Sequence, residues 1–158
     1  MTQPKRYATG TDVPVTRSKT ELNAYLEKIG ATKILLGADK DLGVDVIMFE
    51  VNGRPVKLEV HTPSASEVQA TPTGKRRNGE PLQHAIEAET RRRWRALILM
   101  LTAKWEAIQS GIATFEAEFL PYTMLPNRQT VAEYLEPQVK DIIEHRKMPP
   151  MLPWGDHE

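Results

Sequence analysis

The fold of this 158-residue chain is decided between residues 44 and 61, where the sequence reads VDVIMFEV-NG-RPVKLEVH. Two eight-residue stretches rich in β-branched residues flank Asn52-Gly53, a dipeptide that favours a two-residue hairpin turn. Such a turn fixes which residues oppose each other. The opposed pairs are Val51–Arg54, Phe49–Val56 and Ile47–Leu58. Opposed residues share a face, so the sequence predicts an antiparallel hairpin with one apolar face. That face consists of Ile47, Phe49, Val51, Val56, Leu58 and Val60.

An apolar sheet face requires a helix to cover it, and a first candidate lies just upstream. The spacing of apolar residues predicts a short amphipathic helix over 19–29. Ser18 and Glu21 fit a capping box at its start, and Gly30 is placed to end it in a left-handed conformation. Residues 1–15 carry prolines and a glycine without apolar periodicity, so we expect a flexible arm there.

A third strand and a long connection complete the first half of the chain. The run Lys33–Leu36 is strand-like, which predicts a three-stranded antiparallel meander over 33–61. Residues 62–81 contain three prolines, two glycines and a Lys-Arg-Arg cluster, and they read as a loop. Connections of this length inside a domain are usually functional or disordered, so this loop is the first place to look for function.

The second half of the chain is expected to be helical. The longest helix is predicted over 82–109, followed by a second helix over 112–125. Thr130 to Glu133 forms another capping box and opens a third helix, which Pro137 should kink or restart. Residues 148–158 read as a proline-rich tail. An apolar stripe marks the longest helix as the central core helix, with Thr90, Trp94, Leu97, Ile98, Leu101, Trp105 and Ile108.

These elements predict one α+β domain over 16–147: a short N-terminal helix, a three-stranded meander, a long loop and a helical subdomain of three helices over 82–147. Hydrophobic residues make up 40% of the chain and charged residues 27%, both ordinary for a globular domain. The chain has no cysteine, which excludes disulfides, thiolate metal sites and cysteine nucleophiles. No apolar run is long enough to span a membrane, so we expect a cytoplasmic protein.

The formal net charge is zero, yet charge is distributed unevenly. Residues 75–95 contain seven basic and three acidic residues, whereas residues 105–158 contain nine acidic and four basic ones. Arginine forks match phosphate oxygens, so the basic segment is a candidate nucleic-acid interface. Its expected contacts are Lys75, Arg76, Arg77, Arg91, Arg92 and Arg95. This hypothesis requires that the side chains face outward and find no carboxylate partner within the chain.

Two alternatives compete with a nucleic-acid interface. Glu87 precedes Arg91 by four residues and Glu89 precedes Arg93 by four, the spacing of ion pairs on a solvated helix. Trp94 lies in the middle of the apolar stripe, which favours core packing over base stacking. The second alternative is a protein-interaction module, such as an anti-defence inhibitor or an assembly accessory. It would dock through the acidic C-terminal third and the proline-rich tail, binding a host or phage protein.

Catalytic patterns are scarce in this sequence. The four histidines are scattered, and Gly-x-Ser-x-Gly, Walker A and Gly-x-Gly-x-x-Gly motifs are absent. We therefore expect no enzyme activity, cofactor or metal. The remaining enzymatic option is a site assembled from Asp45, Glu59 and His61.

Several stretches resemble small uncharacterised proteins carried by phages and prophages. They are VPVTRS at 13–18, FEAEFL at 115–120, TVAE at 130–133 and MPPMLP at 148–153. The resemblance implies a mobile-element origin and carries over no catalytic residue.

The order of elements is also similar to the core of Rad52-like single-strand annealing proteins, where a sheet and a long helix form a groove for nucleic-acid backbone in rings of many subunits. Together these observations predict a phage-type nucleic-acid-binding accessory protein, acting in DNA recombination or replication and able to form homo-oligomers.

Overall fold

The Asn52-Gly53 turn connects β2 (Val44–Val51) to β3 (Arg54–His61) in the computed structural model, which describes residues 6–146. Both turn residues have positive φ angles, 51° and 75°, as a two-residue hairpin turn requires. The predicted register is confirmed at all three pairs. β1 (Thr32–Asp39) pairs antiparallel with the other edge of β2, which gives the sheet order β1-β2-β3.

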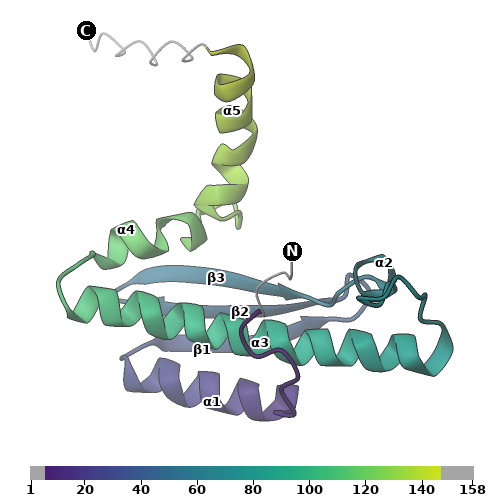
Figure 1. The fold of residues 1–158 in the computed structure, drawn as a ribbon. Coiled ribbons are helices and arrows are strands. Elements are labelled where there is room, and N and C mark those ends of the chain that lie inside the picture. Colours follow the sequence, from purple (N-terminus) through teal and green to yellow (C-terminus); the bar gives the residue numbers. More distant parts are fainter. Residues whose placement is uncertain (1–5, 147–158) are drawn as a thin grey trace, which may run out of the picture.

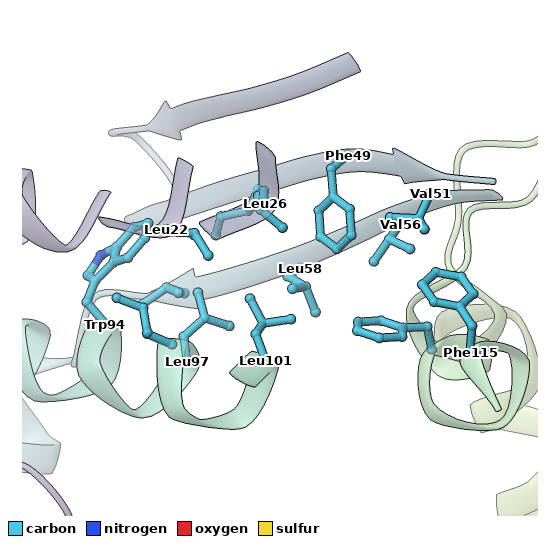
Figure 2. Close-up of a cluster of buried hydrophobic side chains, with 14 residues drawn as sticks. Leu22, Leu26, Phe49, Val51, Val56, Leu58, Trp94, Leu97, Leu101 and Phe115 are labelled. Atoms are coloured by element: carbon cyan, nitrogen blue, oxygen red, sulfur yellow. The ribbon is translucent and has the colours of Figure 1, made fainter. Parts of the chain in front are cut away.

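Two helices cover the apolar face of this sheet, α1 (Val15–Lys28) and α3 (Gly79–Gln109), as Figure 1 shows. All six residues predicted for the apolar face are buried. In Figure 2, Trp94 and Leu101 extend from α3 toward the sheet, beside Leu22 and Leu26 of α1. Trp94 is fully buried, so the prediction that it packs in the core is confirmed. The α+β architecture is therefore as the sequence predicts.

The start of α1 differs from the prediction. The helix begins at Val15 after Pro14, whose extended conformation (φ −61°, ψ 150°) makes it the N-cap residue. Ser18 is therefore inside the helix and forms no capping box. It occupies the buried stripe with Leu22 and Leu26, four and eight residues further along. Tertiary packing favours this boundary, because Val15 in the extra turn packs against the hydrophobic core and Ser18 is fully buried.

The segment 62–81, predicted to be a loop, contains more structure than expected. A one-turn helix, α2 (Ala65–Val68), follows Ser64, which forms a capping box with Glu67. A small closed loop follows, held by the bridge between Ala70 and Arg76. α3 then begins at Gly79 and not at residue 82, because Pro81 is accommodated in its first turn, where its missing N–H would have no helical partner.

The helix expected over 112–125 is also shorter in the structure. Thr114 caps α4 (Phe115–Phe119), and a 3₁₀ turn, η1 (Leu120–Tyr122), follows because Pro121 cannot continue the α-helical hydrogen bonding.

The last described helix, α5 (Val131–His145), has the predicted Thr130–Glu133 capping box at its start. The helix does not restart at Pro137. Proline has no N–H to donate to the carbonyl four residues earlier. Because Pro137 is exposed, water can donate to that carbonyl instead. The predicted tail 148–158 lies outside the described residues. Among the helices of residues 6–146, none is long and apolar enough to cross a membrane.

Candidate functional site

Three of the four arginines of α3 are engaged with the chain's own acidic residues: Arg92, Arg93 and Arg95. Arg92 donates two hydrogen bonds to Glu89, from Nε at 2.8 Å and from Nη2 at 2.7 Å. Arg6 from the N-terminal segment and Arg93 approach the same carboxylate, at 3.5 and 3.6 Å. The hydrogen bonds from Arg92 lower the pKa of the Glu89 carboxyl and raise the pKa of Arg92.

Two further arginines of α3 have partners from distant parts of the sequence. Arg95 donates from both terminal nitrogens to Glu21 on α1, one of these bonds measuring 3.2 Å, and this pairing lowers the pKa of Glu21. Arg93 donates to the carbonyl of His61 at 2.8 Å and forms an ion pair with Glu67 of α2. These side chains hold α1, α2 and the end of β3 against α3.

The remaining predicted contacts donate to neutral groups. Arg91 donates to the carbonyl of Thr11 at 3.2 Å. Arg76 donates to the side-chain carbonyl of Gln69, and Arg77 to the backbone carbonyls of Val68 and Ala70. Within residues 6–146, Lys75 and these three arginines form no ion pair with a carboxylate. The hypothesis that the basic side chains find no carboxylates in the chain is therefore wrong for Arg92 and Arg95.

The expected helical pairs are only partly formed. Glu89 does approach Arg93, but its shorter contacts are to Arg92, three residues along the helix. Trp94 is unavailable for base stacking because its side chain is fully buried; its indole N–H donates to Asp45 at 3.2 Å. Lys19 donates to the same carboxylate at 2.7 Å and lies 5.1 Å from the indole ring centre.

The residues of the enzymatic option do not come together. Asp45 faces the core with Trp94, whereas Glu59 and His61 lie on the opposite face of the sheet, where their side chains approach to 3.3 Å. This separation follows from the strand period of two, since Asp45 opposes Val60. In the described part of the chain, no three His, Asp or Glu side chains are grouped so that they could hold a metal ion.

The most distinctive surface of the molecule lies on α5. In Figure 1 this helix extends away from the sheet and α3, and every residue along it is at least partly exposed. Its apolar residues nevertheless follow one side of the helix, in a band that we call the α5 stripe. The α5 stripe consists of Val131, Tyr134, Leu135, Val139, Ile142 and Ile143. Large parts of its side chains face solvent: 50% of Tyr134, 39% of Leu135, 47% of Val139 and 70% of Ile143.

An apolar groove continues the α5 stripe onto the body of the domain. It runs between η1 and the first turns of α5, and Leu120 is itself half exposed. Its lining residues are Leu120, Pro121, Val131, Ala132, Leu135, Glu136 and Val139. Such a contiguous apolar surface is typical of a binding site on a soluble domain.

The start of α5 is firmly joined to the domain. The N–H of Val131 donates to the carbonyl of Thr123 at 2.9 Å, and Thr130 is buried. Lys57 on β3 approaches Glu133 at 3.3 Å, and the backbone N–H of Thr130 lowers the pKa of the Glu133 carboxyl. These contacts fix the direction in which α5 leaves the domain and so present the α5 stripe in a defined orientation.

A comparison of the chain with protein-family models, curated proteins and solved structures finds no significant match. The likenesses to phage proteins and to single-strand annealing proteins therefore stay hypotheses.

The sequence predicts a helix from the Thr130–Glu133 capping box, but it does not show that the apolar side of this helix is left uncovered by the domain. A helical apolar stripe has the same pattern whether the domain itself or a partner covers it. Two features of the sequence distinguish this helix from α3. Pro137 interrupts its hydrogen bonding and acidic residues dominate its polar side, as is uncommon in a helix packed inside a core.

Proposed function

We propose that this protein is a protein-interaction module that binds its partner through the α5 stripe and the adjoining groove. The observation that carries this proposal is the exposure of four large apolar side chains along one side of α5. Leaving such a surface in water is unfavourable by about 25 cal/mol per Å² of apolar area, and binding a partner removes that cost. An amphipathic helix with apolar anchors at positions i, i+4 and i+8 is a recurrent docking element.

The mode of attachment of α5 supports the same function. A helix of 15 residues is marginal in water by itself, so its capping box and its contacts to β3 and η1 stabilise its first turns. The remaining turns gain little from the domain. A surface held in a fixed direction loses less conformational entropy on binding than a flexible segment would.

Site-specific photo-crosslinking tests this function. A photoreactive phenylalanine analogue replaces Val139 in the full chain, and the matched control carries it at Glu144, which lies on the polar side of the same helix. Irradiation in the producing cells should yield a protein adduct from position 139 and little from position 144. Mass spectrometry identifies the adduct. Equal adduct formation at the two positions, or none at either, would refute the proposal.

Binding of nucleic acid is the second candidate, and one observation favours it. Lys75 and Arg76 are exposed on the last residues of the closed loop, with no carboxylate partner among residues 6–146. Together these two side chains would form a smaller cationic site that does not involve the arginines of α3. A fluorescent oligonucleotide should bind with a steep dependence on salt. The double variant Lys75→Glu/Arg76→Glu should lose this binding, while Lys28→Glu on α1 should keep it. Absence of affinity at low salt would exclude this candidate.

A further inference from the structure

We infer that the proline-rich tail, residues 148–158, runs back along α5 and covers the α5 stripe until a partner displaces it. The tail and a partner then compete for the same surface, so the inference rests on the proposed function and adds its regulation. The tail lies outside the described residues. Its sequence, and the point at which the chain leaves α5, carry the inference.

The chain leaves α5 on the side of the α5 stripe. Arg146 comes four residues after Ile142 and seven after Val139, and these intervals place residues on one side of an α-helix. Arg146 also has left-handed backbone angles (φ 51°, ψ 31°), which end the helix and turn the chain off its axis. After such a turn, a following residue often packs back on the last turns of the helix.

The part of the α5 stripe nearest to this exit is the least covered. The exposed fraction of the side chains is 39% at Leu135, 47% at Val139 and 70% at Ile143. Toward the start of the helix, η1 covers part of the stripe and forms the groove with it. A segment that starts at Arg146 and runs back toward η1 would therefore cover the most exposed side chains first.

The tail carries large apolar residues at intervals of three. They are Met148, Met151 and Trp154, and three prolines lie between them. Prolines favour the polyproline II conformation, which has three residues per turn, so this spacing places the three apolar side chains on one side of the segment. Proline-rich segments in this conformation are a recurrent ligand of apolar, aromatic-lined grooves. The spacing therefore suits the tail to an apolar band such as the α5 stripe.

The length of the tail also matches the length of the helix. From Arg146 back to Val131, α5 spans about 22 Å, since each residue advances an α-helix by about 1.5 Å. In polyproline II, the segment from Arg146 to Trp154 spans about 25 Å, at about 3.1 Å per residue. Trp154 would then lie beside the groove at η1, where Leu120 is half exposed.

The same arithmetic places the two methionines along the stripe. Met148 comes level with Ile142, and Met151 comes level with Leu135. Because the tail is joined directly to α5, its effective concentration at the stripe is on the order of millimolar, so that even a weak contact is formed.

Disulfide trapping tests this inference in the full chain, which has no cysteine of its own. Leu135→Cys/Met151→Cys should close its disulfide at least about tenfold faster than Lys140→Cys/Met151→Cys, because a disulfide requires α-carbons within about 7 Å of one another. Lys140 lies opposite Val131 on the polar side of α5, and it is nearer to Met151 in sequence. A tail without a preferred position would therefore close the control disulfide at least as fast.

A second measurement follows the cover itself. Met151→Ser/Trp154→Ser should increase the binding of a hydrophobic dye at least about twofold, because it uncovers an apolar surface. It should also increase photo-crosslinking from position 139. His157→Ser/Glu158→Ser, which changes two polar residues of the same tail, is the matched control and should bind dye as wild type does. Circular dichroism confirms folding.

Equal rates for the two cysteine pairs, or dye binding unchanged by Met151→Ser/Trp154→Ser, overturn the inference. A disulfide between two chains would assign the tail to a neighbouring copy and overturn it as well. If the inference fails in one of these ways and position 139 still crosslinks to another protein, the proposed function stands. If the tail docks but position 139 yields no protein adduct even in Met151→Ser/Trp154→Ser, the proposed function fails and only the contact between the tail and the α5 stripe stands.

Discussion

Glu89 is the residue on which three arginine side chains converge. It accepts from Arg92 at two oxygens and lies near Arg6 and Arg93. A carboxylate surrounded by guanidinium groups is stabilised in its ionised form, which is why its pKa is lowered. The arginines that suggested a phosphate-binding surface therefore contribute to the fold.

This arrangement predicts a dependence of stability on pH. The pKa of Glu89 is lowered in the folded state, so its contribution is complete above the ordinary glutamate value of 4.5 and is lost as the pH falls below it. Glu89→Gln should therefore be less stable than wild type at neutral pH and should lose less stability on acidification. Urea unfolding at a series of pH values measures both. Parallel pH profiles for the two proteins would show that Glu89 contributes nothing to acid sensitivity.

Ser18 offers a second test at the scale of one residue. Its hydroxyl is fully buried, and within residues 6–146 it finds no hydrogen-bond partner. An unsatisfied buried hydroxyl is unfavourable, and alanine also favours a helix more than serine does. Ser18→Ala should raise the free energy of unfolding by about 0.5–1 kcal/mol, measured by urea denaturation.

Thr130→Ala gives the contrasting measurement, because the Thr130 hydroxyl accepts from the N–H of Glu133 at 3.1 Å. This change should lower stability by about 1 kcal/mol. A loss of stability in Ser18→Ala comparable to that in Thr130→Ala would indicate that Ser18 has a partner after all.

At the scale of elements, the sequence predicts best what its nearest neighbours determine. Asn52 and Gly53 suffice to define the hairpin and its register, because a two-residue turn leaves no freedom in pairing. The Thr130–Glu133 capping box also depends only on neighbouring residues, and its prediction is confirmed. The start of α1 is not locally determined, since Ser18 and Glu21 form the pattern of a capping box, whereas Val15 packs against the core and adds one more turn of helix.

The pairing of the arginines could not be predicted for the same reason. Arg95 and Glu21 are separated by 74 residues, and Arg93 and Glu67 by 26. Only the packing of α1 and α2 on α3 brings them together, whereas the spacing along one helix suggested Glu87 and Glu89 as partners. Likewise, the sequence pattern of α5 cannot show whether the domain covers its apolar side.

Pro137 permits a test of α5 as an element. Proline removes one hydrogen bond from the helix interior, at a cost of about 3 kcal/mol relative to alanine. Pro137→Ala should therefore slow amide hydrogen exchange along α5 by more than tenfold, while the core strands keep their protection. Exchange monitored by mass spectrometry measures both regions. Unchanged exchange in α5 would mean that contacts beyond those of the isolated helix already hold this segment rigid.

The whole molecule consists of a core formed by the sheet with α1 and α3, and of an appended α5 whose apolar side takes no part in that core. We therefore expect that substitutions on the apolar side of α5 change the binding properties of the surface without changing the stability of the fold. Val139→Asp should leave the thermal unfolding midpoint within about 2 °C of wild type, since surface changes are nearly neutral, and should reduce binding of a hydrophobic dye. Leu26→Asp, inside the core, should prevent folding. A large loss of stability in Val139→Asp would place this side chain in the folding core.

The order of elements along the chain has a consequence for synthesis on the ribosome. α1 and the three strands occupy residues 15–61, and each strand pairs only with its neighbour in sequence, so this part of the chain can assemble early. Its apolar surface nevertheless stays in contact with water until α3, which ends at Gln109, has emerged from the exit tunnel. During that interval the nascent chain exposes Phe49 and Leu58, and we expect chaperones to bind it at this stage.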